Sequence, residues 1–153
     1  MRKKGIYLGL LIIILCAFLL LRNNKKNNIA DYNSFFEKKA NEFYDNEDYK
    51  NSVLVFSRLI QLDSTKGDFY YKRGGSYYVL YNYQNAISDF NKCINLNHKK
   101  SKSYYNIGFI YRKLNKDSLA YINFTKAYEC DTLNIDAKAY KEFLEHILKK
   151  NKL

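Results

Sequence analysis

Small and aromatic residues recur along this chain with a fixed period of 34 residues, marked by Ala40, Gly74 and Gly108. An aromatic residue follows each of them after three positions and again after sixteen, and a small residue follows after twelve. The matching columns are Phe43, Tyr77 and Tyr111; Ser52, Ala86 and Ala120; Phe56, Phe90 and Phe124; and Leu59, Cys93 and Ala127. Such a period indicates an array of repeated units, each of which stacks on the next to bury its apolar face.

Within each period, apolar residues at helical spacing predict two helices joined by a short turn. In the second unit the helices are expected over residues 68–80 and 83–96. A polar residue should cap each second helix, and the candidates are Asn82, Asp48 in the first unit, and Asp117 or Ser118 in the third. Gly74 and Gly108 are expected where the second helix comes close, which offsets their helix-propensity cost of about 1 kcal/mol.

The fold class is therefore all-α, with units over residues 33–66, 67–100 and 101–134 in a domain that spans residues 33–150. An amphipathic helix follows over residues 136–150. Its apolar stripe consists of Tyr140, Phe143, Leu144, Ile147 and Leu148. We expect this helix to cover the open end of the last unit, as repeat arrays require for solubility.

The amino-terminal residues predict a membrane anchor. Three basic residues precede an apolar stretch over residues 5–21, which as a helix would be about 26 Å long and so near the lower limit for crossing a bilayer. No small-residue cleavage site follows it, so residues 1–22 indicate an uncleaved signal anchor and residues 23–32 a polar linker. A lipoprotein signal acylated at Cys16 is the alternative, although the residues before Cys16 are bulky.

The sidedness of the anchor follows less directly from the charges. Basic residues flank the apolar stretch on both sides, so the positive-inside rule barely separates the two orientations. The short basic leader favours a cytoplasmic amino end, with the repeats outside a bacterial cytoplasm. A cytoplasmic location of the repeats stays open.

Charge and composition narrow the function. The chain carries 26 Lys and Arg against 15 Asp and Glu, a net charge of +11, and it lacks proline, as an all-helical chain should. The basic residues alternate with acids instead of forming a stripe, which argues against nucleic-acid binding. Cys93 and Cys130 both fall where helices should pack, with no spacing that suggests a metal site. No phosphate loop, catalytic motif or paired carboxylates are present, so we expect no enzyme activity and no cofactor.

The recurring columns resemble those of the tetratricopeptide repeat family, with three repeats and a capping helix over residues 33–150. The proline that often closes such a repeat is replaced by Ser64, His98 and Thr132. The resemblance implies that the first helix of each repeat lines a concave groove for a partner peptide or protein. On this chain the implied groove residues are Lys38, Asn41, Tyr44, Tyr71, Lys72, Tyr78, Lys102, Tyr105, Asn106, Phe109, Arg112 and Lys113.

This set is basic and aromatic, which suits an acidic peptide or a terminal carboxylate. One branch of the family clamps the carboxylate of a chaperone's last residue with five polar side chains. Only Asn41 and Lys102 match that pattern, whereas Glu37, Lys72 and Asn106 depart from it. We therefore do not predict that clamp.

Taken together, the sequence predicts a membrane-tethered protein-interaction module without catalysis of its own. The alternative from another class is a basic domain that binds polyanions or anionic lipid. Salt separates the two, because polyanion binding weakens steeply as the salt concentration rises.

Overall fold

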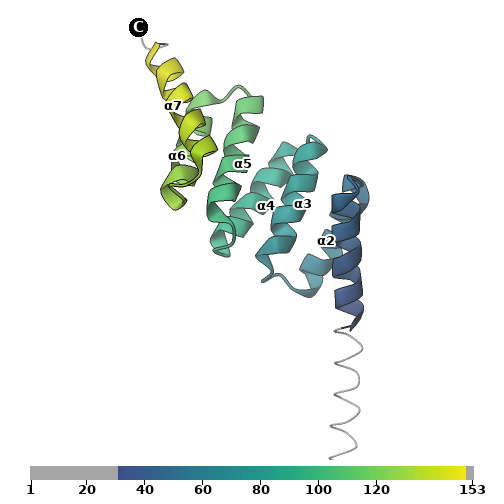
Figure 1. The fold of residues 1–153 in the computed structure, drawn as a ribbon. Helices are drawn as coiled ribbons and strands as arrows, with labels where there is room; N and C mark the ends of the chain where they lie inside the picture. Colours follow the sequence, from purple (N-terminus) through teal and green to yellow (C-terminus); the bar gives the residue numbers. More distant parts are fainter. Residues whose placement is uncertain (1–30, 151–153) are drawn as a thin grey trace, which may run out of the picture. The chain divides into compact units, whose positions relative to one another are not determined.

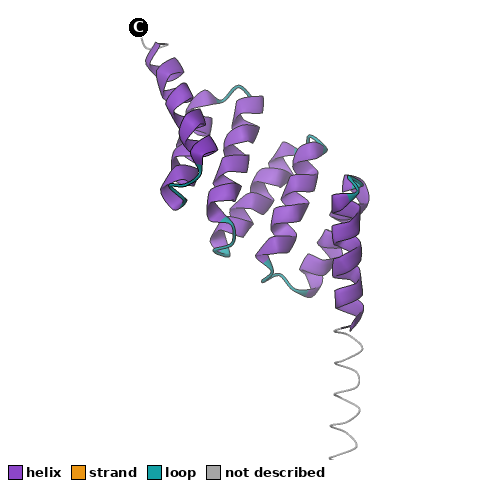
Figure 2. Cartoon of the chain, viewed as in Figure 1, coloured by secondary structure: helices purple, strands orange, loops and turns teal. Residues whose placement is uncertain are grey.

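The computed structural model describes residues 31–150, and in this range the chain consists of helices and the turns between them (Figure 2). The chain divides into two units, one ending at Lys38 and the other beginning at Lys39. Within residues 31–150 no helix has the length and apolar character needed to cross a membrane. The predicted anchor over residues 1–22, Cys16 and most of the linker lie outside the described residues.

Consecutive helices of the second unit pack side by side, each against the next (Figure 1). A helix over residues 31–45 comes first, and its part from residue 39 belongs to this unit. The others are α2 (Tyr49–Leu62), α3 (Gly67–Val79), α4 (Tyr83–Asn95), α5 (Lys100–Lys113), α6 (Asp117–Cys130) and α7 (Ile135–Lys150). The helices predicted over residues 68–80 and 83–96 are confirmed within one residue at each end.

The columns that recur every 34 residues form the core. Ala40, Phe56, Phe90 and Phe124 are all at most 1% exposed. The other buried column members are Gly74, Gly108, Ser52, Ala86, Ala120, Leu59, Cys93 and Ala127. The column of Phe43, Tyr77 and Tyr111 is half-buried instead. The periodicity therefore identifies the residues that hold each hairpin together.

Two glycines lie where an aromatic ring of the second helix presses on the first. A Cβ atom on Gly74 would lie 3.2 Å from the Phe90 ring, and one on Gly108 would lie 2.9 Å from the Phe124 ring. The second distance is shorter than real Cβ contacts, so the hairpin of α5 and α6 closes only because residue 108 lacks a side chain. The expected close approach is confirmed at both positions.

Two of the three predicted helix caps are confirmed. The side chains of Asp48 and Asn82 accept hydrogen bonds from the backbone N–H groups of Asn51 and Asn85. The prediction for the third repeat is wrong, because the cap position belongs to Lys116, which makes no side-chain bond there.

Asp117 does not cap the helix of the third repeat, because its carboxylate is bonded to Arg112. Asp117 lies in the first turn of α6 and accepts a hydrogen bond from Arg112 Nη1 across the turn. Ser118 follows it inside the helix.

The prediction that both cysteines pack between helices is confirmed for one of them and wrong for the other. Cys93 is buried as predicted, and its Sγ–H donates to the carbonyl of His98 at 3.0 Å. Cys130 is exposed, so the packing expected for it is wrong, since it is the last residue of α6 and faces solvent. Both are free thiols.

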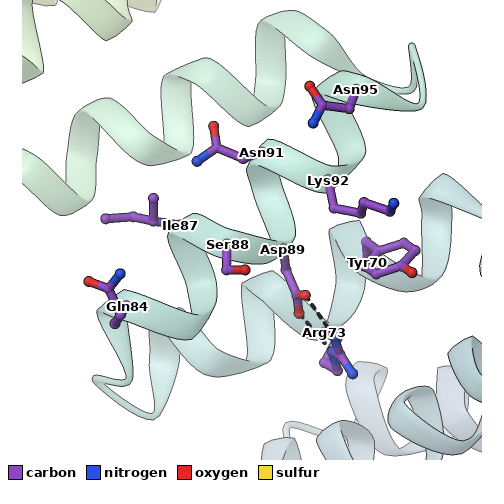
Figure 3. Close-up of a pocket in the computed structure, with 9 residues that line it drawn as sticks. All are labelled: Tyr70, Arg73, Gln84, Ile87, Ser88, Asp89, Asn91, Lys92 and Asn95. Carbon is purple, nitrogen blue, oxygen red and sulfur yellow. Dashed lines mark hydrogen bonds and ion pairs between the residues drawn. The ribbon is translucent and has the colours of Figure 1, made fainter.

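A buried ion pair joins three helices of the second unit. Arg73 on α3 donates from Nε and Nη2 to both carboxylate oxygens of Asp89 on α4, each at 2.7 Å, as the dashed lines in Figure 3 show. Its Nη1 donates to Ser57 on α2 at 3.0 Å, and its guanidinium lies over the rings of Tyr70 and Tyr77. Asp89 is only 4% exposed, so this pair ties the first hairpin to the second in a poorly hydrated place.

The last helix carries polar residues where a further hairpin would pack. Ala137 and Leu144 are buried against the preceding helices. Glu142, which stands 34 positions after Gly108, is exposed and faces Lys138 at 3.9 Å. A charged side chain at this position disfavours the close approach that a further second helix needs.

We expect Gly108→Leu to destabilise the hairpin of α5 and α6 by about 2 kcal/mol or more, because overpacking outweighs the helix-propensity gain of about 1 kcal/mol. Denaturant unfolding followed by circular dichroism measures the loss. Lys113→Leu adds the same side chain at an exposed position of α5 and should leave stability nearly unchanged. If the two variants unfolded at the same denaturant concentration, Gly108 would not be a position of close helix contact.

We expect Asp89→Ala to lower the free energy of unfolding by about 3 kcal/mol, because it leaves the guanidinium of Arg73 without its partner. The double variant Arg73→Met with Asp89→Leu should recover most of that loss, since an apolar pair replaces the ion pair. Lys149→Ala, which breaks an exposed pair with Glu145, is the control and should not move the midpoint. A double variant as unstable as the single one would contradict this account.

Candidate functional site

Side chains on the first helices of successive hairpins touch one another and form a continuous surface. Lys72 Nζ donates to Asn41 Oδ1 at 2.5 Å, and Asn106 Nδ2 lies 3.5 Å from the Tyr71 hydroxyl oxygen, to which it donates. We call this surface the first-helix face. Its members are Asn41, Tyr44, Tyr71, Lys72, Tyr78, Tyr105, Asn106 and Phe109.

A hollow of about 290 Å³ opens on this face between α3 and α5, lined by Tyr78, Tyr105, Asn106 and Phe109. Tyr105 and Phe109 stand edge-on to each other with ring centroids 4.9 Å apart. Both also rest on the buried ring of Phe124, at 5.6 and 5.5 Å. The wall of the hollow is therefore continuous with the core and is held in place by it.

The lining is mostly apolar but has hydrogen-bonding groups at its edge. Burial, and then the negative charge of Asp136, raise the pKa of the Tyr105 hydroxyl above its usual value. The hydroxyl therefore stays neutral and can donate. With the amide of Asn106 beside it, the hollow offers aromatic walls and two polar groups, a combination that suits one apolar side chain of an approaching peptide.

Cations at one end of the first-helix face are held by Asp68. Lys99 Nζ donates to Asp68 Oδ1 at 2.5 Å, and Lys72 Nζ lies 3.6 Å from Oδ2. His98 Nε2 lies 3.4 Å from Oδ1, and the ammonium of Lys99 also sits 4.5 Å from the centroid of the Tyr71 ring.

Burial would raise the pKa of the Asp68 carboxyl, but the hydrogen bond from Lys99 and the charges of Lys99 and Lys72 outweigh it and lower that pKa. The carboxylate thus fixes two lysines beside the tyrosine ring. Asp68 was expected near one end of the groove, but Lys99 was not predicted for the site, although it follows Asp68 by the same 31 residues that separate Asn41 and Lys72.

Tyr44 packs across the face against α3. A Cβ atom on Gly75 would lie 2.9 Å from the Tyr44 hydroxyl oxygen, so only glycine leaves room for that group. Burial is the main cause that raises the pKa of Tyr44, followed by the nearby phenol of Tyr71. Tyr44 therefore forms part of the floor of the face.

Four predicted groove residues lie outside the first-helix face, and Lys113 is one of them, exposed at the end of α5. Lys102 is exposed and lines a different hollow of about 470 Å³, together with Lys99, Lys100 and Cys130 among others. Arg112 is bonded to Asp117 and lies 5.8 Å from the centroid of the Phe143 ring. Lys38 is an exposed residue of the first unit.

A third hollow of about 500 Å³ runs along the exposed side of α4 (Figure 3). Its floor is the Arg73–Asp89 pair. Its sides carry the uncharged polar residues Gln84, Ser88, Asn91 and Asn95. This hollow was not predicted from the sequence, because the helical spacing of its polar residues is typical of an ordinary solvated face. Over residues 31–150, no three His, Cys, Asp or Glu side chains group closely enough to hold a metal ion.

The Tetratricopeptide repeat family model matches residues 67–99 and 101–131 of this chain. A comparison with curated proteins gives no match. Among solved structures, the chain is similar to the TPR domain of Arabidopsis OM64, with 22% identity and a TM-score of 0.67 over 74% of this chain and 94% of that one.

Two similar structures hold bound peptides. The first TPR of Spaghetti (RPAP3), bound to the HSP90 peptide SRMEEVD, shares 20% identity with a TM-score of 0.68 over 76% of this chain and 93% of that one. The Yersinia enterocolitica type III secretion chaperone SycD, in complex with a peptide of the translocator YopD, shares 17% identity with a TM-score of 0.71 over 78% of this chain and 95% of that one. At these identities the likeness establishes the fold.

We expect Asp68→Asn to flatten the acid limb of the stability curve. A lowered folded-state pKa gives stability that is fully present above the unfolded pKa of about 3.9 and is lost as the pH falls through the folded value. Because Asp68 is 39% exposed, the effect should be below about 1 kcal/mol. Denaturant unfolding between about pH 5 and pH 2 measures the difference from the wild type. Asp45→Asn, at the exposed end of the helix over residues 31–45, is the control. An equal change in that variant would show that the ion pairs of Asp68 are not the cause.

Proposed function

Because this chain belongs to the tetratricopeptide repeat family, we propose that it is a protein-interaction module whose first-helix face binds a peptide segment of a partner protein. The observation that carries the proposal is the hollow between Tyr78, Tyr105 and Phe109, on the same first-helix face as two lysines held in place by Asp68. Rigid aromatic walls take up an apolar side chain at low entropic cost. The proposal includes no catalytic step.

The chemistry of the face favours one class of peptide. An apolar anchor residue fits the hollow, and acidic residues next to it would meet the ammonium groups of Lys72 and Lys99. In two structures of similar fold the protein is bound to an HSP90 peptide or to a YopD peptide, which supports peptide binding as the activity of this chain.

The peptide should differ from a chaperone's terminal carboxylate. Asn41 accepts a hydrogen bond from Lys72, and Lys102 lines another hollow, so we expect that the two residues that match the carboxylate clamp do not act on one ligand. The RPAP3 peptide SRMEEVD is therefore a suitable probe of the difference. We expect this chain to bind it weakly, if at all.

We also propose that residues 1–22 tether the chain to a membrane, with residues 33–150 as the interaction domain outside a bacterial cytoplasm. The support is the basic leader before the apolar stretch and the short polar linker that follows. A tethered dock of this kind would gather its partners at a membrane face, where confinement raises their effective concentration.

We expect Tyr78→Ala to reduce partner capture by roughly tenfold or more, because it removes one wall of the hollow. The test is an affinity capture with the detergent-solubilised chain, with retained proteins measured by mass spectrometry and helicity by circular dichroism. Tyr81→Ala is the matched control, since Tyr81 is 79% exposed in the adjoining turn and does not line the hollow. Equal capture by both variants would move the binding surface elsewhere.

The lysines give a second, independent contrast. Lys72→Glu should weaken capture, whereas Lys102→Glu should not, because only Lys72 belongs to the first-helix face. Capture that survives moderate salt supports peptide binding, whereas capture that collapses with salt and with either lysine change would favour the polyanion-binding alternative.

A further inference from the structure

We propose that the end of the second unit at which the chain enters docks on the headgroups of an anionic bilayer. The inference rests on the proposed membrane tether and goes beyond it, because it assigns a membrane-facing surface to residues of the repeats themselves. We call this surface the entry end. Its members are Lys100, Lys102, Leu133 and Ile135.

The entry end is built from turns that the fold brings together. α3, α5 and α7 begin at the same end of the stack (Figure 1), and the helical segment from residue 39 runs parallel to α3, because Asn41 contacts Lys72 and Tyr44 lies against Gly75. Asn134 Nδ2 donates to Ser101 Oγ at 3.0 Å, and Ser101 Oγ donates to the carbonyl of Ala127 at 2.8 Å. The turn before α7 is therefore bonded to the start of α5, and both present one surface.

Two aliphatic side chains project from this surface. Leu133 is 85% exposed and Ile135 is 77% exposed, so neither contributes to the core. The turn that carries them is rigid, because the N–H of Leu133 donates to Asp131 Oδ1 at 3.1 Å and that of Ala137 to Asn134 Oδ1 at 3.0 Å. Two large aliphatic groups fixed in water are unfavourable for a free surface and suit contact with an apolar phase.

Cations stand beside these aliphatic groups. Lys99, Lys100 and Lys102 line the hollow of about 470 Å³ that reaches Cys130 and Asp131. Lys99 is paired with Asp68, but Lys100 and Lys102 form no ion pair within residues 31–150. Aliphatic tips flanked by lysines match a bilayer interface, where the tips enter the acyl boundary and the ammonium groups stay among anionic headgroups.

The length of chain before the unit makes this contact possible. Residues 23–30 can extend at most about 28 Å, and residues 31–38 are helical and add about 12 Å. An anchor that ends at residue 22 would therefore hold Lys39 within about 40 Å of the bilayer.

Exposed apolar residues also occur at the opposite end, where Tyr81 and Leu114 lie in the turns after α3 and α5. At that end α3 and α5 terminate, and the nearby Arg112 is paired with Asp117. The two ends therefore provide matched positions for a test within a single molecule.

The test uses the full chain with Cys16→Ser, labelled at the exposed Cys130 with an environment-sensitive fluorophore, while Cys93 is buried and protected. The chain is placed in nanodiscs of phosphatidylcholine alone or mixed with phosphatidylglycerol. We expect emission at shorter wavelength and quenching by lipid-borne nitroxide, both stronger with phosphatidylglycerol and both reduced by salt. The same fluorophore at Asn115→Cys, in a Cys130→Ser background, should stay in water.

Variants of the surface complete the test. Leu133→Ser with Ile135→Ser should abolish the shift at Cys130 without changing helicity, as should Lys100→Glu with Lys102→Glu. Lys113→Glu with Lys116→Glu at the opposite end should leave it intact.

Each other outcome overturns a defined part of the argument. Co-elution of the chain with the discs reports the tether separately, and a chain that stays outside them would overturn both the tether and the docking. A chain inside the discs whose two probe positions respond alike would overturn the docking and leave the tether standing. A shift without lipid that grows with protein concentration would show that a second copy covers the entry end, which also overturns the proposal.

Discussion

Each hairpin depends on an aromatic ring of its second helix pressed against a residue of the first helix that has no bulky side chain. The contact between Phe124 and Gly108 is the closest of these, with no room for a Cβ atom. A single hairpin cannot cover such a ring from all sides, because two helices leave one face of it open. The following first helix covers that face, so the stack exists because the rings must be buried.

The same contact places the candidate binding surface. Because α6 lies close to α5 at Gly108, the ring of Phe124 contacts and supports Tyr105 and Phe109. Tyr140 on α7 then stacks on Phe124 with centroids 5.0 Å apart and closes the cluster. The walls of the hollow are therefore held in place by the core. Such a preformed surface would change shape little on binding a ligand, which would reduce the entropic cost of binding.

The sequence predicts the apolar columns well because the same buried position occurs in all three repeats. It predicts individual polar contacts poorly, because each such contact occurs in one repeat alone. Arg73 and Asp89 occupy positions that are Lys39 and Val55 in the first repeat and Ile107 and Asn123 in the third, so only the second repeat carries the ion pair. The pair was hard to predict, because these columns are not uniformly buried: Lys39 is exposed and Val55 is half-buried. The failed cap at Asp117 has the same origin, because a carboxylate can cap a helix or pair with an arginine, and spacing alone does not decide between them.

Net charge is likewise a poor guide to what this chain binds, because some of its basic residues are paired with acidic residues of the fold. Arg73 and Arg112 each hold an aspartate, and Lys72 and Lys99 share Asp68. Excess charge therefore acts only where lysines lack such partners, and location matters more than the total. On the first-helix face the partly compensated lysines would favour the proposed peptide over a dense polyanion. At the start of α5 the unpaired lysines stand beside exposed aliphatic groups, and that combination suits a surface that is both charged and apolar, as a bilayer is.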